Sequence, residues 1–219
     1  MKAWLGMVSL SAGLAVAGLA CSSNPLAKGQ RQMAAGEYAK AVETFQALAK
    51  ENPQDPRVYN ELGLAYAKQE KNAEAEQTYR KAVKLDPAFP EAHFNLGTAY
   101  LRQMGLLEAE AEFRLAIKNR PDYVKAYNNL GLALMSMGKF DEAEQNFKKA
   151  IELAPNEAVY RDNLQYCRNL GKSTKENLKG YLEEKRKEEE KRKPAEKPKE
   201  NEKPTKKTPS PPPKAPPAP

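Results

Sequence analysis

Hydrophobic and polar positions alternate with a helical period through most of this chain. Apolar residues recur at three- and four-residue spacings from Tyr59 to Tyr66, and again from Ala75 to Ala82, on either side of the polar stretch KQEKN. That spacing places each series on one face of an α-helix. Proline cannot continue a helix, so Pro87 ends the second one. The pattern predicts two helices of about a dozen residues, joined by a short polar turn.

The same pattern returns every 34 residues. Small residues such as Gly63 and Ala75 let the two helices of a hairpin approach closely, and Tyr66 and Tyr79 fill the space beside them. One hairpin cannot bury both of its apolar faces, so a fixed period predicts a solenoid of stacked hairpins. Three sets of identical residues mark the period: Pro53, Pro87, Pro121 and Pro155; Gly29, Gly63, Gly97 and Gly131; Ala41, Ala75, Ala109 and Ala143.

When the repeats are aligned, the residues at equivalent positions form columns. The residues that recur in these columns resemble the tetratricopeptide repeat. Leu-Gly, an aromatic residue or leucine, Ala, an aromatic residue, Ala and Pro recur at that family's spacings. The resemblance implies an all-α solenoid of antiparallel helix hairpins. Pro25 and Lys28 stand where later repeats have an aromatic residue and leucine, so we expect a short or frayed first helix. The resemblance covers four repeats, at residues 22–55, 56–89, 90–123 and 124–157.

The chain after the fourth repeat is predicted to have two parts. Residues 158–193 hold a degenerate fifth repeat that acts as a capping helix, because Gln165 and Arg168 give it a polar outer face, followed by a charged helix. Residues 194–219 carry ten of the 17 prolines and are predicted to be a disordered, Pro- and Lys-rich tail. The tail either makes the chain more soluble or extends towards a partner, which is the anionic cell wall or another protein.

The N-terminal residues have the layout of a bacterial secretory signal. Lys2 precedes an uncharged apolar run, and small residues lead to Cys21. The end of this segment resembles a lipoprotein signal, which implies removal of residues 1–20 and acylation of Cys21 by palmitate-type chains. Ser22 and Ser23 follow with no aspartate, which favours the periplasm-facing outer membrane. An ordinary signal or an uncleaved anchor is the alternative.

The net charge of +7 is unevenly distributed. Residues 171–219 contain 15 Lys or Arg and nine Asp or Glu, and Lys2 adds one more cation. Residues 22–170 therefore hold 20 residues of each sign and are neutral. The basic excess belongs to the tail, and the repeats show no basic face with interleaved aromatic residues, so we expect no nucleic-acid partner.

Catalytic and metal-binding patterns are absent from the sequence. The one histidine, His93, falls in the column of Tyr59 and Tyr127, so its expected role is packing. Cys167 falls in an alanine column and is expected to be a small buried residue. No glycine-rich phosphate loop, metal-ligand spacing or nucleophile with a base is present. We therefore predict that the protein is not an enzyme and needs no cofactor or metal.

The family resemblance implies that the first helices of successive hairpins line a concave groove. Apolar residues exposed in one line usually mark an interaction site, so we predict a groove for a protein or peptide partner. The alternative is that a neighbouring helix or the tail covers part of this line. The predicted groove residues are Asn60, Leu64, Lys68, Phe94, Thr98, Leu101, Arg102, Lys125, Asn128, Leu132 and Met135.

Some tetratricopeptide domains clamp the C-terminal carboxylate of a chaperone with lysine, asparagine and arginine side chains. Asn95 and Lys125 match two of these positions, but Asn60, Leu64 and Asn129 occupy the others. The incomplete set disfavours a cytosolic co-chaperone.

These features together predict a lipid-anchored adaptor that mediates protein–protein interactions in a bacterial cell envelope. The architecture resembles the type IV pilus biogenesis lipoproteins, the pilotins that help a secretin ring assemble. The alternative is a regulatory scaffold for an envelope enzyme of cell-wall or polysaccharide synthesis.

Overall fold

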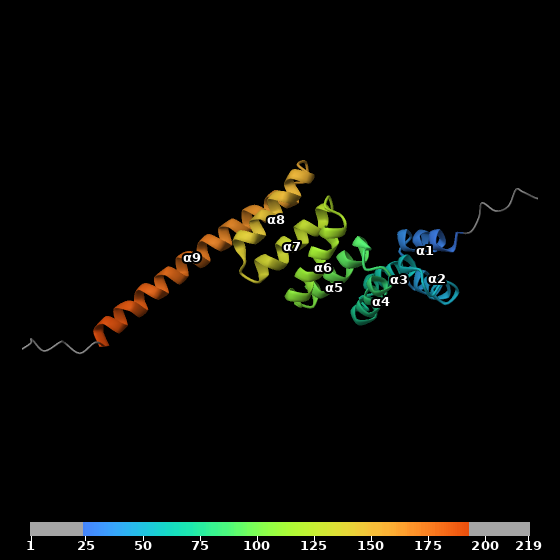
Figure 1. The fold of residues 1–219 in the computed structure, drawn as a ribbon, viewed down its shortest axis with the longest axis horizontal. Coiled ribbons are helices and arrows are strands. Elements are labelled where there is room, and N and C mark those ends of the chain that lie inside the picture. The colour runs from blue at the N-terminus through green and yellow to red at the C-terminus, as the bar shows by residue number, and fades with distance from the viewer. Residues whose placement is uncertain (1–23, 193–219) are drawn as a thin grey trace, which may run out of the picture. The chain divides into compact units, whose positions relative to one another are not determined.

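The computed structural model describes residues 24–192, and every helix or strand assigned in that range is an α-helix (Figure 1). This confirms the predicted all-α fold. The predicted signal, Cys21 and the tail lie outside the described residues. The helices are α1 (Pro25–Ala34), α2 (Tyr38–Glu51), α3 (Pro56–Lys68), α4 (Asn72–Leu85), α5 (Pro90–Arg102), α6 (Leu106–Asn119), α7 (Val124–Ser136), α8 (Phe140–Leu153) and α9 (Ala158–Arg192).

Local sequence signals begin and end these helices. Proline occupies the first turn of α1, α3 and α5, where its missing N–H costs nothing. The Asp55 side chain caps α3 by accepting a hydrogen bond from the Arg57 backbone N–H at 3.0 Å. The turn between the helices of each hairpin has one left-handed residue. It is glycine in two repeats, with φ of 75° at Gly36 and 76° at Gly138, and Glu70 and Met104 take φ of 61° there.

Each hairpin closes through a glycine that faces an aromatic ring. A Cβ atom on Gly63 would lie 2.5 Å from the Tyr79 ring, and one on Gly131 would lie 2.7 Å from the Phe147 ring. Only a residue without a side chain leaves room for this approach. The hairpins α1–α2, α3–α4, α5–α6 and α7–α8 are thus tightly paired, and each second helix also packs on the first helix of the next hairpin.

The core runs continuously into the first part of α9. Phe113 and Phe147 are fully buried in one cluster with Cys167 and Leu164 of α9. The prediction that Cys167 is a small buried residue is therefore confirmed. Residue contacts divide the chain after Thr174, and the remainder of α9 belongs to a separate unit.

The first helices of the hairpins lie side by side, since α1 contacts α3, α3 contacts α5, and α5 contacts α7. We call the surface that they share with the start of α9 the groove face. The side chains of this surface come from equivalent positions of successive repeats, 34 residues apart. On the groove face such a set of positions runs from one first helix to the next, and we call it a row.

Candidate functional site

A pocket of about 460 Å³ opens on the groove face between α3 and α5. The second helix α4 forms its floor, and one residue of α7 closes its edge. The lining residues are Leu64, Ala67, Lys68, Asn72, Ala75, Tyr79, Phe94, Asn95, Thr98, Ala99, Arg102 and Lys125. We call this site the basic pocket.

Six of the predicted groove residues line the basic pocket, namely Leu64, Lys68, Phe94, Thr98, Arg102 and Lys125. The other predicted residues lie elsewhere. Asn60 is buried, and its side-chain carbonyl accepts a hydrogen bond from Asn95 Nδ2 at 2.8 Å, so it does not line the pocket surface. The pocket lining does not include Leu101 of α5 or Asn128, Leu132 and Met135 of α7.

The residues that line the pocket include three cations and no carboxylate. Lys68, Arg102 and Lys125 form no ion pair with any residue between 24 and 192, and no Asp or Glu is among the lining residues. Burial raises the pKa of the Tyr79 phenol far above its ordinary value; the nearby Arg102 opposes that shift, and the charge of Glu61 adds to it. The phenol therefore stays neutral, and the net charge of the lining is positive.

Phe94 supplies the aromatic surface of the pocket. Its side chain is half-buried, with its ring centroid 5.0 Å from that of Tyr123 and 5.9 Å from that of Phe113. These tilted contacts fix the orientation of the ring. Burial raises the pKa of Tyr123 to about 12, so this neighbour is also uncharged. An apolar anchor and three cations thus face the same space.

Amide side chains tie neighbouring first helices together across the groove face. Asn163 Nδ2 donates to Asn128 Oδ1 at 2.8 Å, which repeats between α9 and α7 the contact of Asn95 with Asn60 between α5 and α3. The two pairs are two repeats apart, and they set the position of α3 against α5 and of α7 against α9. Asn60 and Asn128 are therefore structural residues, which their place in the sequence did not reveal.

The sequence pattern did not place Asn72 in the groove, and it assigned Tyr79 to a different role. Asn72 opens α4 beside the pocket, in a column that is apolar at Leu106 and Phe140. That departure from the repeat pattern is the signal that could have found it. Tyr79 was predicted to fill the hairpin core; it does so, and it also lines the pocket.

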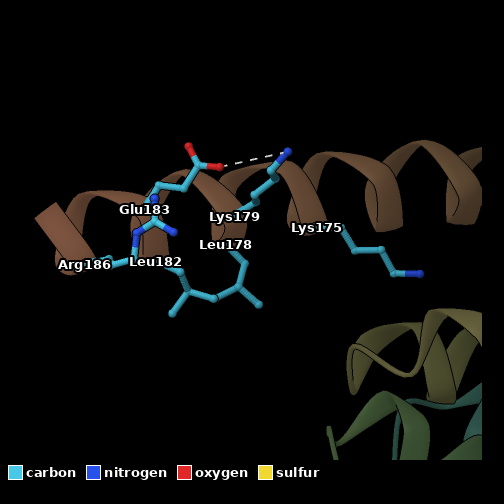
Figure 2. A pocket seen from close by; sticks show the side chains of 6 residues that line it. All are labelled: Lys175, Leu178, Lys179, Leu182, Glu183 and Arg186. Atoms are coloured by element: carbon cyan, nitrogen blue, oxygen red, sulfur yellow. Dashed lines mark ion pairs between the residues drawn. The ribbon is translucent and has the colours of Figure 1, made fainter.

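Beyond Thr174, α9 carries a shallow depression of about 370 Å³ (Figure 2). Leu178 and Leu182 lie one turn apart on the same side of the helix, and Lys179 forms an ion pair with Glu183 at 4.0 Å. All of the lining residues belong to this one helix and are exposed. The depression is part of the surface of this one helix, and its polar groups are charged side chains.

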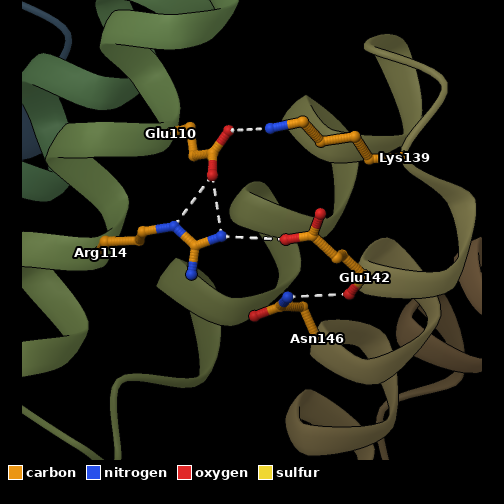
Figure 3. Close-up of polar contacts among 5 residues, drawn as sticks. All are labelled: Glu110, Arg114, Lys139, Glu142 and Asn146. Atoms are coloured by element: carbon orange, nitrogen blue, oxygen red, sulfur yellow. Dashed lines mark hydrogen bonds and ion pairs between the residues drawn. The ribbon is translucent and has the colours of Figure 1, made fainter.

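An ion-pair cluster joins the third and fourth hairpins (Figure 3). Glu110 of α6 accepts hydrogen bonds from Arg114 at 2.8 Å and from Lys139 at 2.9 Å, and Arg114 also contacts Glu142 at 3.2 Å. Desolvation raises the pKa of Glu110, but the two cations outweigh it and leave that pKa below the ordinary value. All four charges are satisfied within the cluster, so its role is structural.

Between residues 24 and 192, no set of His, Cys, Asp and Glu side chains could coordinate a metal ion. In the same range, no helix combines the length and apolarity needed to span a membrane.

Comparison with known families identifies the fold. Models of the tetratricopeptide repeat match residues 26–90 and 66–123, and a second model of this repeat matches residues 124–157. Together they cover residues 26–157, which is more than half of the chain. The chain is a tetratricopeptide-repeat protein. No curated protein sequence matches it significantly.

Solved tetratricopeptide structures resemble this repeat protein. The first repeat domain of Spaghetti (RPAP3), bound to the HSP90 peptide SRMEEVD, is 32% identical with a TM-score of 0.52, covering 53% of this chain and 92% of that one. The OM64 domain from Arabidopsis is 27% identical with a TM-score of 0.52, covering 54% and 98%. MamA is 24% identical with a TM-score of 0.60, covering 74% and 96%, and shows the shared fold alone.

Proteins of this family are generally non-enzymatic interaction scaffolds, and the tetratricopeptide fold of this chain indicates the same broad class, a scaffold for protein–protein interactions.

Proposed function

We propose that the basic pocket binds an extended acidic segment of a partner protein. The observation that carries this proposal is the set of three cations, Lys68, Arg102 and Lys125, that line the pocket and form no ion pair with any residue between 24 and 192. Charge complementarity of this kind selects partners and speeds their encounter. Phe94 offers a partly buried aromatic surface, the residue type that often dominates binding energy at an interface.

The similar RPAP3 domain supports a peptide as the ligand. Its bound peptide, SRMEEVD, contains three acidic residues, and that domain is 32% identical to this chain. The mode of binding must differ in detail, because of the five clamp positions only Asn95 and Lys125 match, and Lys68 and Arg102 lie outside that set.

Charge reversal tests the proposal. Lys68→Glu combined with Arg102→Glu should reduce capture of the partner by tenfold or more, because two favourable contacts become repulsive. Partner capture is measured by photocrosslinking in cells from a probe placed at Ala67 or Ala99, followed by mass spectrometry. Both positions line the pocket.

A matched control has the same change in net charge away from the pocket. Lys84→Glu combined with Lys118→Glu alters two exposed lysines on the second helices α4 and α6. This control should leave capture unchanged. Equal loss in both double variants would show that the overall charge of the chain, not the pocket, attracts the partner.

We further propose that the scaffold is lipid-anchored through Cys21 and faces the periplasm from the outer membrane. The apolar segment that ends at Cys21 supports this proposal. Labelling with a palmitate analogue should be lost in Cys21→Ala and retained in Cys167→Ala, since Cys167 is buried and serves as the matched control. Mature protein that stays on the membrane after Cys21→Ala would rule out the lipid as its main anchor.

Within the envelope, the proposed partner is a component of type IV pilus or secretin assembly, because the order of a signal, a cysteine and tetratricopeptide repeats resembles the pilotin lipoproteins. The second candidate is an enzyme of cell-wall or polysaccharide synthesis, towards which the basic tail could extend. Crosslinking from the basic pocket distinguishes the two: a secretin among the products selects the first, and a peptidoglycan synthase or hydrolase the second.

A further inference from the structure

The groove face changes character beyond the basic pocket. In the row that contains Lys68 and Arg102, the next two positions are Ser136 and Leu170, so the cations give way to an uncharged and then an apolar residue. The row that contains Thr98 continues through an apolar residue of α7 to an aromatic residue of α9. We call the resulting surface on α7 and α9 the apolar shelf; it consists of Leu132, Met135, Tyr166 and Leu170.

The side chains of the shelf are accessible. Tyr166 is 59% exposed and Leu170 is 37% exposed, while Leu132 and Met135 are half-buried against the core. Tyr166 and Leu170 are four residues apart and so lie on one face of α9. Single exposed apolar residues are ordinary, but a contiguous group on an interaction face indicates a binding surface.

Two independent contacts fix the orientation of this part of α9. Leu164 and Cys167 are buried in the core cluster of α7 and α8, and Cys167 Sγ donates to the Phe140 carbonyl at 3.6 Å. The Asn163–Asn128 hydrogen bond then fixes α9 beside α7. Tyr166 and Leu170 therefore face outward as part of a packed helix, and the shelf is a built surface.

We infer that the apolar shelf and the basic pocket bind one and the same peptide, whose acidic residues lie over α3 and α5 and whose large apolar side chain lies over α7 and α9. This inference rests on the proposed function. It adds a large apolar residue to the acidic residues that the partner must carry, and it states over which helices each of them lies. Continuity supports a single occupant, because both surfaces belong to rows of the same groove face.

Charge supports the same arrangement. The cations Lys68, Arg102 and Lys125 all line the basic pocket, whereas the exposed Asp162 occupies in α9 the register position of Asn128 in α7. Asp162 would repel acidic residues from the α9 end. The shelf has only four apolar residues, too few for the roughly 800 Å² per partner that a stable dimer interface buries. A second copy of the chain is therefore a poor occupant.

The geometry also predicts the spacing within the peptide. Neighbouring packed helices lie about 8–10 Å apart, so two steps from α5 to α9 span roughly 16–20 Å. An extended peptide rises about 3.3 Å per residue. The large apolar residue should therefore lie about five or six residues from the acidic group.

Selection from a random peptide library, displayed on phage and applied to the full chain, tests the inference. The selected peptides should be enriched in an acidic cluster and in a Leu, Phe, Tyr or Trp about five or six residues away. Tyr166→Ser combined with Leu170→Ser should reduce the apolar enrichment by roughly tenfold and leave the acidic enrichment in place. Both side chains are exposed, so the variant should keep the helical circular dichroism of the parent chain.

The matched control is Leu107→Ser combined with Leu115→Ser, which removes two exposed apolar residues from the second helix α6. It should change neither enrichment. Acidic enrichment with no apolar preference, or an apolar preference that survives the Tyr166 and Leu170 changes, overturns the inference while the proposed function stands. Absence of acidic enrichment overturns both. Binding that occurs only after removal of residues 194–219 would assign the groove face to the chain's own tail and also overturn the inference.

Discussion

His93 and Glu112 form a buried pair in which Nδ1 of His93 lies 2.6 Å from a carboxylate oxygen of Glu112. The other ring nitrogen, Nε2, lies 2.9 Å from the Pro87 carbonyl oxygen. Both partners are acceptors, so both nitrogens donate and the ring is favoured in its protonated, cationic form. The pair joins α5 to α6 and to the preceding turn, and it gives the one histidine of the chain a larger role than packing.

The stability of the repeats should therefore depend on pH through His93. Desolvation lowers the pKa of His93, but the hydrogen bonds that its ring donates to Glu112 and Pro87, together with the charges of Glu112 and Asp86, outweigh it and raise that pKa above its ordinary value of 6.5. A raised folded-state pKa contributes stability that is fully present below the unfolded value and is lost as pH rises through the folded value. The free energy of unfolding in urea should thus fall as the pH rises above about 6.5.

His93→Tyr is the matched control for this pH dependence. Tyr59 occupies the same column and donates its hydroxyl to the Pro53 carbonyl at 3.2 Å, so a tyrosine can make the equivalent contact without titrating in this range. The variant should lack the loss of stability that the parent protein shows as the pH rises above about 6.5. Parallel pH profiles for the two proteins would show that another group causes the change.

Gly131→Ala should destabilise the fourth hairpin. The added Cβ would lie 2.7 Å from the Phe147 ring, and a fully buried ring has no free space to move into. Overpacking of this kind costs about 1–3 kcal/mol, measurable as a lower midpoint of urea unfolding. Gly180→Ala is the control, since nothing lies within 4 Å of a Cβ at that helical position. If Gly180→Ala destabilised the chain as much as Gly131→Ala, steric collision would not be the cause.

Glu144 should stabilise the junction of α8 and α9 in a way that acid removes. Hydrogen bonds from Arg168 and Lys148 lower its pKa from 4.5 to about 2. A lowered pKa gives stability that is present above about pH 4.5 and is lost as pH falls towards 2. Glu144→Gln should cost about 1 kcal/mol or less at pH 7, because Arg168 is partly exposed, and nothing at pH 2.

Glu152→Gln on the same helix is the comparison for Glu144. Glu152 pairs with Lys149 at 2.9 Å, but its side chain is 64% exposed and the pair lies within α8. Its replacement should change the unfolding free energy little at any pH. An equally large loss of unfolding free energy in Glu152→Gln at pH 7 would mean that ion pairs within α8, and not the contact with α9, cause the Glu144 effect.

Two phenylalanines in contact should respond differently to truncation. Phe113 is fully buried, so Phe113→Ala should cost about 3–5 kcal/mol of stability. Phe94 is half-buried and faces the basic pocket, so Phe94→Ala should keep the helix content and weaken partner capture by roughly tenfold. Circular dichroism and crosslinking measure the two effects. Unchanged capture in a folded Phe94→Ala protein would move the binding site off the groove face.

Deletion of residues 194–219 should hardly change the thermal stability of the repeats, because a Pro- and Lys-rich segment has few apolar groups to bury. The melting temperature of the shortened chain gives the measurement. A fall of more than a few degrees would require the tail to dock on the solenoid.

The sequence by itself determined the fold. The Gly, Ala and Pro columns specify where helices pair, where they end and how often the unit repeats, because each repeat buries its apolar faces only against its neighbours. The contact of Gly131 with Phe147 and the burial of Cys167 follow directly from their columns.

Only the tertiary structure decided which polar side chains are hydrogen-bonded within the fold and which face the pocket. Asn60 and Lys68 are both polar residues on α3, yet Asn60 is buried against Asn95 while Lys68 lines a pocket without a carboxylate. The position of a residue within the repeat predicts the helix face on which its side chain lies. Its hydrogen bonds and ion pairs depend on side chains from other repeats. The gathering of three cations in the basic pocket, and the double hydrogen bonding of His93, arise from the approach of residues that periodicity alone does not bring together.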